Sequence, residues 1–376
     1  MITIKEARTK SDMKAFVKFP FKLYQNNPNW IPPLISDELE TFDRDKNPAF
    51  DNAEAYFYLA FQNGEMVGRT AVIINWAEVN ELGKRKVRFG WFDVIDDIEV
   101  TRALLEKAFE LARAHQLENV EGPMGFSNLD KTGALTMGYD QVGTMITWYN
   151  YPYYVTHFEK LGFKMEKEWI ESRFPLPTEE MIAPIRKADA LIRKRYGLKI
   201  VNFKDSRSVM PYVDALFDIF NTAYARLSSF VAVSDRQIAY FKKKYIKLIN
   251  PDYIKFVEDA NGKVIAFCIV MPSLSEALKK ANGKLFPFGW FHLLWAQKHT
   301  DEVLFYLIGV LPEYQNKGVT AVIISEFFES FKANGVKICI RTPELEENHS
   351  IHNLWKNFDA KVHKRRATFI KYLDEI

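Results

Sequence analysis

Two halves of the sequence present the same elements in the same order, and this repeat limits the fold more than any other feature. Asn63-Gly64 lies between two apolar runs, and Asn261-Gly262 lies between two others. Asn-Gly in this setting is a strong signal for a β-hairpin with a two-residue turn. A buried-strand pattern follows in each half, at Val87–Val94 and again at Val303–Val310. Because this period is too long for a solenoid, we predict two tandem domains built on one mixed α/β plan.

The elements of each copy can be placed from hydrophobic periodicity and turn residues. In the first half the pattern predicts strands and helices over residues 2–4, 11–25, 55–61, 66–74, 87–95 and 100–114. In the second half it predicts an opening strand and a hairpin, over residues 200–203, 254–258 and 264–270. Phe158–Lys164 and Trp355–Lys361 are a third matching pair near the ends of the copies. Each copy is therefore expected to be a mixed twisted sheet flanked by helices.

The boundary between the copies is expected near two prolines. Pro175 and Pro177 break the strand pattern that precedes them, because proline has no N–H to give to a sheet. Thr178 is suited to cap the helix that follows, which has acidic residues in its first turn. We therefore predict an N-terminal domain over residues 1–175 and a C-terminal domain over residues 176–376.

Composition and charge are those of an ordinary globular protein. The chain has 376 residues, enough for two domains that each bury a core, with 48% hydrophobic and 26% charged residues. A balance of 51 basic and 48 acidic residues leaves a net charge of +3, which argues against a nucleic-acid partner. The sequence has no apolar signal core at its start and no apolar run of the ~18 residues that a transmembrane helix needs. A cytoplasmic protein is expected.

The segment from Asp301 to Gly335 has the pattern of a strand, a tight turn and a helix. Val303–Leu311 is apolar, Pro312 ends this run, and helix-spaced apolar residues begin after Gly318. The first turn of a helix has unpaired N–H groups and the positive end of the dipole, and both suit a phosphate. Gly318 lets the backbone approach such a ligand closely. An ordinary turn before a helix is the alternative explanation.

This segment resembles the acyl-CoA-binding segment of the GNAT N-acetyltransferase superfamily. In that family a strand ending in Val-x-Pro-x-Tyr leads into Arg/Gln-x-x-Gly-x-Gly/Ala, whose backbone amides hold the CoA pyrophosphate. The residues that match this pattern here are Val310, Pro312, Tyr314, Gln315 and Gly318. Thr320 departs from it, because its Cβ crowds the approach where the family has Gly or Ala, although its hydroxyl could donate to a phosphate. The ending Glu159–Phe163 also resembles a closing motif of GNAT domains.

The resemblance implies two tandem GNAT-like folds that transfer an acyl group from acetyl-CoA or a longer acyl-CoA to a small-molecule amine or a peptide. Cofactor contacts are implied at Val310, Leu311, Gln315, Asn316, Lys317, Gly318, Val319, Thr320 and Asn348. The corresponding loop of the first copy has no glycine and carries Asp96, Asp97 and Glu99. These carboxylates would repel a pyrophosphate. The first copy is therefore expected to have lost CoA binding.

The catalytic groups are less clearly marked. In the family a Tyr before Glu-Lys-Leu-Gly-Phe often protonates the leaving thiolate, but Phe158 and Trp355 stand at that position in the two copies. Neither side chain can serve as an acid in the way that a phenol does. Tyr306 and Tyr314 are the alternative acids, each with packing as its alternative role. Glu347, beside Glu346, is a candidate base if burial raises its pKa. A non-catalytic acyl-CoA-binding or scaffolding protein is the rival interpretation.

Two insertions and several small features complete the sequence-based interpretation. The Gly- and aromatic-rich stretch 122–154 suits a ligand pocket, or else an irregular lid between domains. The aromatic stretch 273–298 could line an acyl groove, touch a membrane, or form an interdomain or homodimer contact.

The neighbouring residues suggest roles for the two cysteines, the basic runs and two of the histidines. Cys268 and Cys339 are predicted to be buried free thiols. The basic runs 242–244 and 364–366 are interpreted as solvated faces, with CoA phosphates or anionic lipids as alternative partners. His349 and His352 have no third ligand near them, so no metal site is expected.

Overall fold

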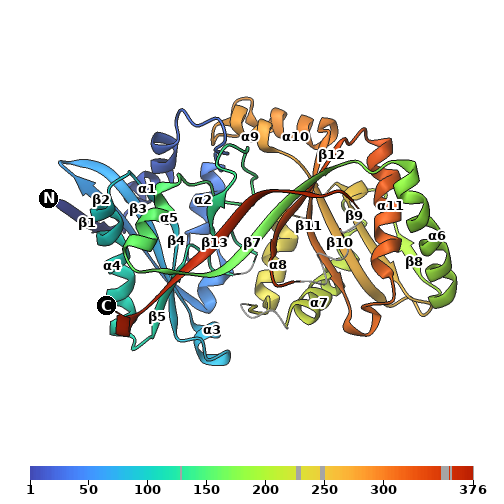
Figure 1. Cartoon of the computed structure of the whole chain (residues 1–376), viewed down its shortest axis with the longest axis horizontal. Helices are drawn as coiled ribbons and strands as arrows, with labels where there is room; N and C mark the ends of the chain where they lie inside the picture. The colour runs from blue at the N-terminus through green and yellow to red at the C-terminus, as the bar shows by residue number, and fades with distance from the viewer. Residues whose placement is uncertain (128, 226–229, 246–249, 349–354, 356–357, 376) are drawn as a thin grey trace. The chain divides into compact units, whose positions relative to one another are not determined.

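The computed structural model describes residues 1–127, 129–225, 230–245, 250–348, 355 and 358–375 (Figure 1). The chain divides into two compact units that are each made of several segments. The first unit comprises Met1–Ile170, Ser275–His292 and His363–Ile376, and the second comprises Glu171–Leu274 and Leu293–Val362. The sequence-based division at residue 175 stays a prediction.

The first unit contains a mixed sheet in which the last strand of the chain takes part. Its strand order is β1-β2-β3-β4-β5-β13, and β6 also pairs with β13. Only β4 and β5 are parallel among these pairs; the other pairs are antiparallel. The bounds are β1 (Ile2–Glu6), β2 (Ala53–Gln62), β3 (Glu65–Asn75), β4 (Lys86–Val94), β5 (Asn119–Gly122), β6 (Ala134–Met137) and β13 (Lys361–Tyr372).

Helices cover both faces of this sheet. Val72 and Ile74 belong to one buried apolar cluster with Leu104 of helix α4, whereas Ile73 packs in a second cluster with Phe16 of helix α1. Alternate residues of a strand face opposite sides, so β3 is buried on both faces. The helices are α1 (Lys10–Leu23), α2 (Ile35–Thr41), α3 (Trp76–Glu81), α4 (Ile98–Ala114), α5 (Tyr153–Lys160) and α9 (Ser275–Ala281).

The second unit repeats the plan with the strand order β12-β11-β10-β9-β8. Strands β11 and β12 are parallel, and the hairpin of β9 and β10 precedes them. The strands are β8 (Lys199–Val201), β9 (Ile254–Glu258), β10 (Val264–Pro272), β11 (Glu302–Val310) and β12 (Ile338–Leu345). The helices are α6 (Glu179–Tyr196), α7 (Val213–Tyr224), α8 (Asp235–Tyr245) and α11 (Val319–Ala333). Strand β7 (Lys164–Pro175), helix α10 (Gly289–His299) and strand β13 each pass from residues of one unit to residues of the other.

Predictions from turn and cap chemistry are confirmed at the first hairpin and at the start of α6. At the second hairpin the predicted two-residue turn is wrong, because the five residues 259–263 join β9 and β10 and only Gly262 of the Asn261-Gly262 pair has a positive φ angle. Asn63 and Gly64 have φ angles of 52° and 83°, the left-handed values that a two-residue hairpin turn requires. Thr178 is the N-cap of α6, where its hydroxyl accepts the N–H of Met181 at 3.4 Å. Cys268 and Cys339 are buried and free, and burial raises the pKa of the Cys339 thiol to about 12.

The interpretation of residues 364–366 as a solvated face is wrong. The side chains of Lys364 and Arg366 are buried in the first unit. Lys364 Nζ donates to the carbonyl of Val142 at 3.2 Å, and Arg366 donates to the carbonyls of Gly133 and Trp148, each at 3.1 Å. These basic residues lie on β13, where they hold the loop region 122–154, and a charge count along the sequence does not reveal such partners.

Among the described helices, none is long and apolar enough to cross a membrane.

Candidate functional site

The strand, turn and helix predicted around Gly318 form in the second unit. Strand β11 ends at Val310, residues 312–314 form a 3₁₀ turn, and α11 begins at Val319. Gly318 is the N-cap of α11 with a φ angle of 78°, and no side chain caps this end of the helix. Asn316 also has a positive φ angle, of 60°. The first N–H groups of a helix have no acceptor within the helix, so this loop leads into a start of α11 that is suited to an anion.

Side chains of the loop hold its shape from within the second unit. Tyr314 donates its hydroxyl to Asp259 Oδ2 at 3.0 Å, and this bond raises the pKa of Tyr314 above its usual value. Gln315 Nε2 donates to the carbonyl of Val310 at 3.0 Å, which joins two of the predicted cofactor residues. The ammonium group of Lys317 lies over the rings of Tyr314 and Tyr196, at 4.9 and 5.6 Å from their centroids. Tyr314 is therefore an anchor of the loop.

The same position in the first unit is filled by the chain's own acidic groups. Asp97 caps α4 by accepting the N–H of Glu99 at 2.9 Å. Asp96 Oδ1 lies 3.2 Å from Nε2 of His157, and Nδ1 of the same ring lies 2.9 Å from the hydroxyl of Thr101. A carboxylate already satisfies the start of α4, so the two units differ in how the corresponding helix begins.

Strands β11 and β12 pair with each other only along the first residues of each strand. Their ladder runs from Glu302 opposite Ile338 to Phe305 opposite Arg341, although β11 continues to Val310. Tyr306, a predicted catalytic residue, is half-buried directly after the last ladder pair. Tyr224 at the end of α7 donates its hydroxyl to the carbonyl of Ile308 at 3.0 Å, and burial raises its pKa. Sequence reasoning missed Tyr224, because nothing in the α7 pattern connects it with β11.

Trp355 is held in an aromatic cluster. Its ring centroid is 4.7 Å from that of Phe305 and 5.6 Å from that of Phe174. Its indole N–H donates to Glu344 Oε1 at 3.1 Å, and Glu344 also pairs with Arg341. Trp355 is thus engaged in packing and in fixing Glu344, an acid at the end of β12 that the sequence interpretation did not single out.

The remaining predicted residues lie close to the end of β12. Glu347 is exposed in a turn, and Asn348 is half-buried with its N–H bonded to the carbonyl of Leu345 at 3.0 Å. Of the cofactor residues, Leu311 and Val319 are buried, whereas Gln315, Asn316 and Lys317 are exposed. His349 and His352 lie outside the described residues.

We expect Gly318→Ala to destabilise the protein more than Gly262→Ala does. Both glycines have left-handed φ angles, of 78° and 80°, so an added Cβ costs about 1–2 kcal/mol at either position. At Gly318 this Cβ would also lie 2.5 Å from Cδ1 of Ile192 on α6, whereas at Gly262 nothing lies within 4 Å. Overpacking should add about 1 kcal/mol at Gly318. Denaturant unfolding of the two variants measures this difference, and equal losses would contradict a close approach of α6 to the loop.

In the first unit a buried polar cluster lies at the end of β4. Asp93 accepts from the hydroxyl of Tyr24 at 2.9 Å and from Nε of Arg69 at 2.8 Å. The hydroxyls of Tyr24 and Tyr154 are 2.9 Å apart, and burial together with the Asp93 charge raises the pKa of both phenols. Beside this cluster, Trp91 and Asn150 line a cavity of about 10 Å³, which has room for a single water molecule. Residues of the loop region 122–154 therefore pack closely against the end of β4 in the first unit.

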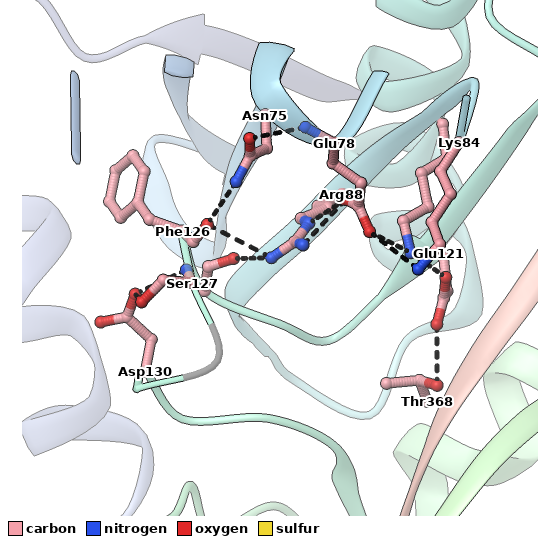
Figure 2. Close-up of polar contacts among 11 residues, drawn as sticks. Asn75, Glu78, Lys84, Arg88, Glu121, Phe126, Ser127, Asp130 and Thr368 are labelled. Carbon is pink, nitrogen blue, oxygen red and sulfur yellow. Dashed lines mark hydrogen bonds and ion pairs between the residues drawn. The ribbon is translucent and has the colours of Figure 1, made fainter. Parts of the chain in front are cut away.

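A second buried network joins α3, β4 and β5 (Figure 2). Arg88 Nε donates to Glu78 at 2.9 Å, and its NH1 donates to the carbonyl of Gly125 at 2.9 Å. Lys86 Nζ lies 3.0 Å from Glu78 and 2.6 Å from Glu121. Two carboxylates thus face two buried cations. Burial alone would raise the pKa of Glu78, but the charges of Arg88 and Lys86 outweigh it and hold that pKa below its usual value.

Two curated proteins are similar to this chain in sequence. No family model matches the chain. Protein YghO of Escherichia coli K12 is 29% identical over 376 residues, covering 97% of this chain and 94% of that protein. A bacterial ceramide synthase of Caulobacter vibrioides is 26% identical over 308 residues, covering 79% of this chain and 77% of the relative.

Solved structures identify the fold. A tandem GNAT protein from the clavulanic acid biosynthesis pathway superposes with a TM-score of 0.58 at 11% identity, over 99% of this chain and 98% of that one. A GNAT acetyltransferase from Sphaerobacter thermophilus gives a TM-score of 0.53 at 11% identity, over 99% and 95% of the two chains. The chain therefore has the tandem GNAT fold, which confirms the predicted fold class.

Proposed function

We propose that the protein is an acyl-CoA-dependent N-acyltransferase whose C-terminal domain, residues 176–376, binds the acyl-CoA. The observation that carries this proposal is the contrast between the two helix starts. Asp97 caps α4 in the first unit, whereas Gly318 leaves the start of α11 without a side-chain cap. A pyrophosphate would compete with a carboxylate at α4 but would meet unpaired N–H groups at α11. The N-terminal copy is then degenerate for the cofactor.

The loop residues have the chemistry that a CoA pyrophosphate needs. The backbone of residues 316 and 318–320 would supply N–H donors, whereas the N–H groups of Gln315 and Lys317 already bond to carbonyls of the turn. Gly318 has no side chain to obstruct these donors. Lys317 is exposed beside the loop and would add a positive charge. Val310, Leu311 and Asn348 would hold the pantetheine arm. Thr320 is half-buried at the second position of α11, where its N–H is among the unpaired donors.

The transfer requires two proton movements, and we assign one residue to each. The acceptor amine attacks the thioester carbonyl, the C–S bond breaks, and the amine proton passes to Glu347 as the proposed base. Tyr306 is the proposed acid that protonates the departing thiolate.

The acceptor class is suggested by one relative. A ceramide is an amide formed on a long-chain amine, and the Caulobacter relative carries the name ceramide synthase. This supports an amine acceptor and a longer acyl-CoA rather than acetyl-CoA. The other acceptors that the fold admits are small-molecule amines and peptides.

A non-catalytic acyl-CoA-binding or scaffolding protein is the second candidate. The observation that favours it is the environment of Trp355, which stands where the family often has its tyrosine acid. Trp355 is buried, and its N–H is taken by Glu344. The position therefore supplies no phenol for the leaving thiolate.

Calorimetric titration with acetyl-CoA and a long-chain acyl-CoA, followed by a thiol-release assay with a panel of amines, tests both candidates. We expect binding of the long-chain acyl-CoA, and release of free thiol only when an amine acceptor is present. Binding without thiol release across all amines would favour the non-catalytic candidate. Absence of binding to either acyl-CoA would exclude both.

A further inference from the structure

Large apolar side chains are exposed along one short segment, Phe286–Trp295, which we call the aromatic segment. It comprises the end of the loop after α9 and most of α10, drawn in orange in Figure 1. The exposed fractions are 79% for Phe286, 69% for Phe288, 46% for Trp290, 54% for Phe291, 50% for Leu294 and 53% for Trp295. Exposed apolar residues that occur singly are normal, but a contiguous group of this size marks a binding surface.

Helix α10 has its polarity reversed relative to an ordinary surface helix. Its small residues Gly289 and Ala296 are buried and Leu293 is half-buried, whereas four large residues are exposed: Trp290, Phe291, Leu294 and Trp295. A Cβ at Gly289 would lie only 2.0 Å from the carbonyl oxygen of Lys284, so glycine is required at this close approach. The helix is thus fixed through small side chains, and its aromatic residues form a face that is left in water.

Along the sequence, the charged residues next to the aromatic segment are all basic. Between Glu276 and Asp301 the sequence contains no acidic residue and four lysines, Lys279, Lys280, Lys284 and Lys298. Lys280 and Lys284 are exposed immediately before the aromatic segment, and Lys298 is exposed directly after it. A partner with an apolar layer and negative charge would therefore complement this stretch of the chain.

We propose that the aromatic segment docks on the surface of an anionic lipid bilayer. Tryptophan and phenylalanine partition into the region between headgroups and acyl chains, and flanking lysines bind anionic headgroups. A second copy of the chain is a poorer occupant, because a symmetric contact would bring two sets of lysines of the same sign together. This docking is independent of acyl transfer and needs no bound acyl-CoA.

The test is sedimentation of the full-length protein with vesicles of equal parts phosphatidylglycerol and phosphatidylcholine. We expect binding, with a shift of tryptophan emission to shorter wavelength as Trp290 and Trp295 leave water. Phe288→Ser combined with Phe291→Ser should weaken the partition at least tenfold. Both side chains are more than half exposed, so the double variant should fold normally. Leu82→Ser is the matched control, since Leu82 is 46% exposed elsewhere in the chain, and it should bind as the unaltered protein does.

The charge component is tested with Lys280→Gln combined with Lys284→Gln. This variant should bind several-fold more weakly to the same vesicles, and added salt should weaken the unaltered protein similarly. Equal binding by the Phe288/Phe291 variant would overturn the proposal. So would a lack of vesicle binding, and in that case light scattering that shows a dimer abolished by the same variant would identify a second copy as the occupant.

Discussion

Glu78→Gln is expected to lower the free energy of unfolding by at least about 3 kcal/mol, because it leaves the buried Arg88 charged and without its carboxylate partner, while Lys86 keeps Glu121 alone. Glu78 is only 1% exposed, and Arg88 and Lys86, which face it, are also buried. The amide that replaces the carboxylate would carry no charge to offset these two cations. Arg88 also donates to the carbonyls of Gly125 and Phe126 (Figure 2), so its loss of a partner would disturb the start of the loop region 122–154.

Chemical unfolding followed by circular dichroism measures the loss, with Glu106→Gln as the matched control. Glu106 pairs with Arg113 on α4, and both side chains are nearly half exposed. An exposed pair contributes at most about 1 kcal/mol, so the control should change little. Similar small losses in both variants would show that water reaches the Glu78 cluster and that its charges are not buried.

The same carboxylate makes stability depend on pH in a definite direction. The pKa of Glu78 is lowered in the folded protein, so the unfolded chain binds its proton more readily. Its contribution is therefore fully present above pH 4.5, the ordinary pKa of the group, and is lost as the pH falls toward the lower folded value. Glu78→Gln should reduce this acid-side slope, whereas Glu106→Gln should preserve it.

Local signals in the sequence predict much of the fold. Asn63-Gly64 locates the first hairpin, and Thr178 locates the start of α6, because such residues act through bonds within a few positions along the chain. The pairing of β13 with β5 is different, since Phe369 lies opposite Gly122. No local pattern in residues 361–372 says which sheet they join, so this pairing could not be predicted.

In the candidate sites, too, local features could be predicted from the sequence and long-range contacts could not. The turn around Gly318 was predicted because strand, turn and helix are consecutive, and its φ angle and open helix start agree with that pattern. The roles of its individual residues stay predictions. Glu78 and Arg88 resemble ordinary surface charges in the sequence, and only the packing of α3 against β4 makes them a buried pair. Tyr224 reaches Ile308 across the second unit, which is equally invisible to a local pattern.

Thr320→Pro is expected to weaken acyl-CoA binding about ten- to hundredfold, if the N–H groups at the start of α11 hold the pyrophosphate. Proline within the first turn removes a backbone donor that has no acceptor in the helix, so α11 should still form. A hydrogen bond to a charged group contributes about 1.5–3 kcal/mol, which corresponds to this loss of affinity. Calorimetric titration measures the affinity, and circular dichroism verifies that the variant is folded.

Thr320→Ala separates the backbone from the side chain at the same position. It keeps the N–H but removes the hydroxyl and the crowding γ-methyl, so its affinity should equal or exceed that of the unaltered protein. Equal weakening by alanine and proline would mean that the hydroxyl, not the backbone, binds the phosphate. Full affinity in the proline variant would place the cofactor elsewhere. In that case the uncapped start of α11 would be an ordinary feature of the turn, and the contrast with the Asp97 cap of α4 would carry no functional meaning.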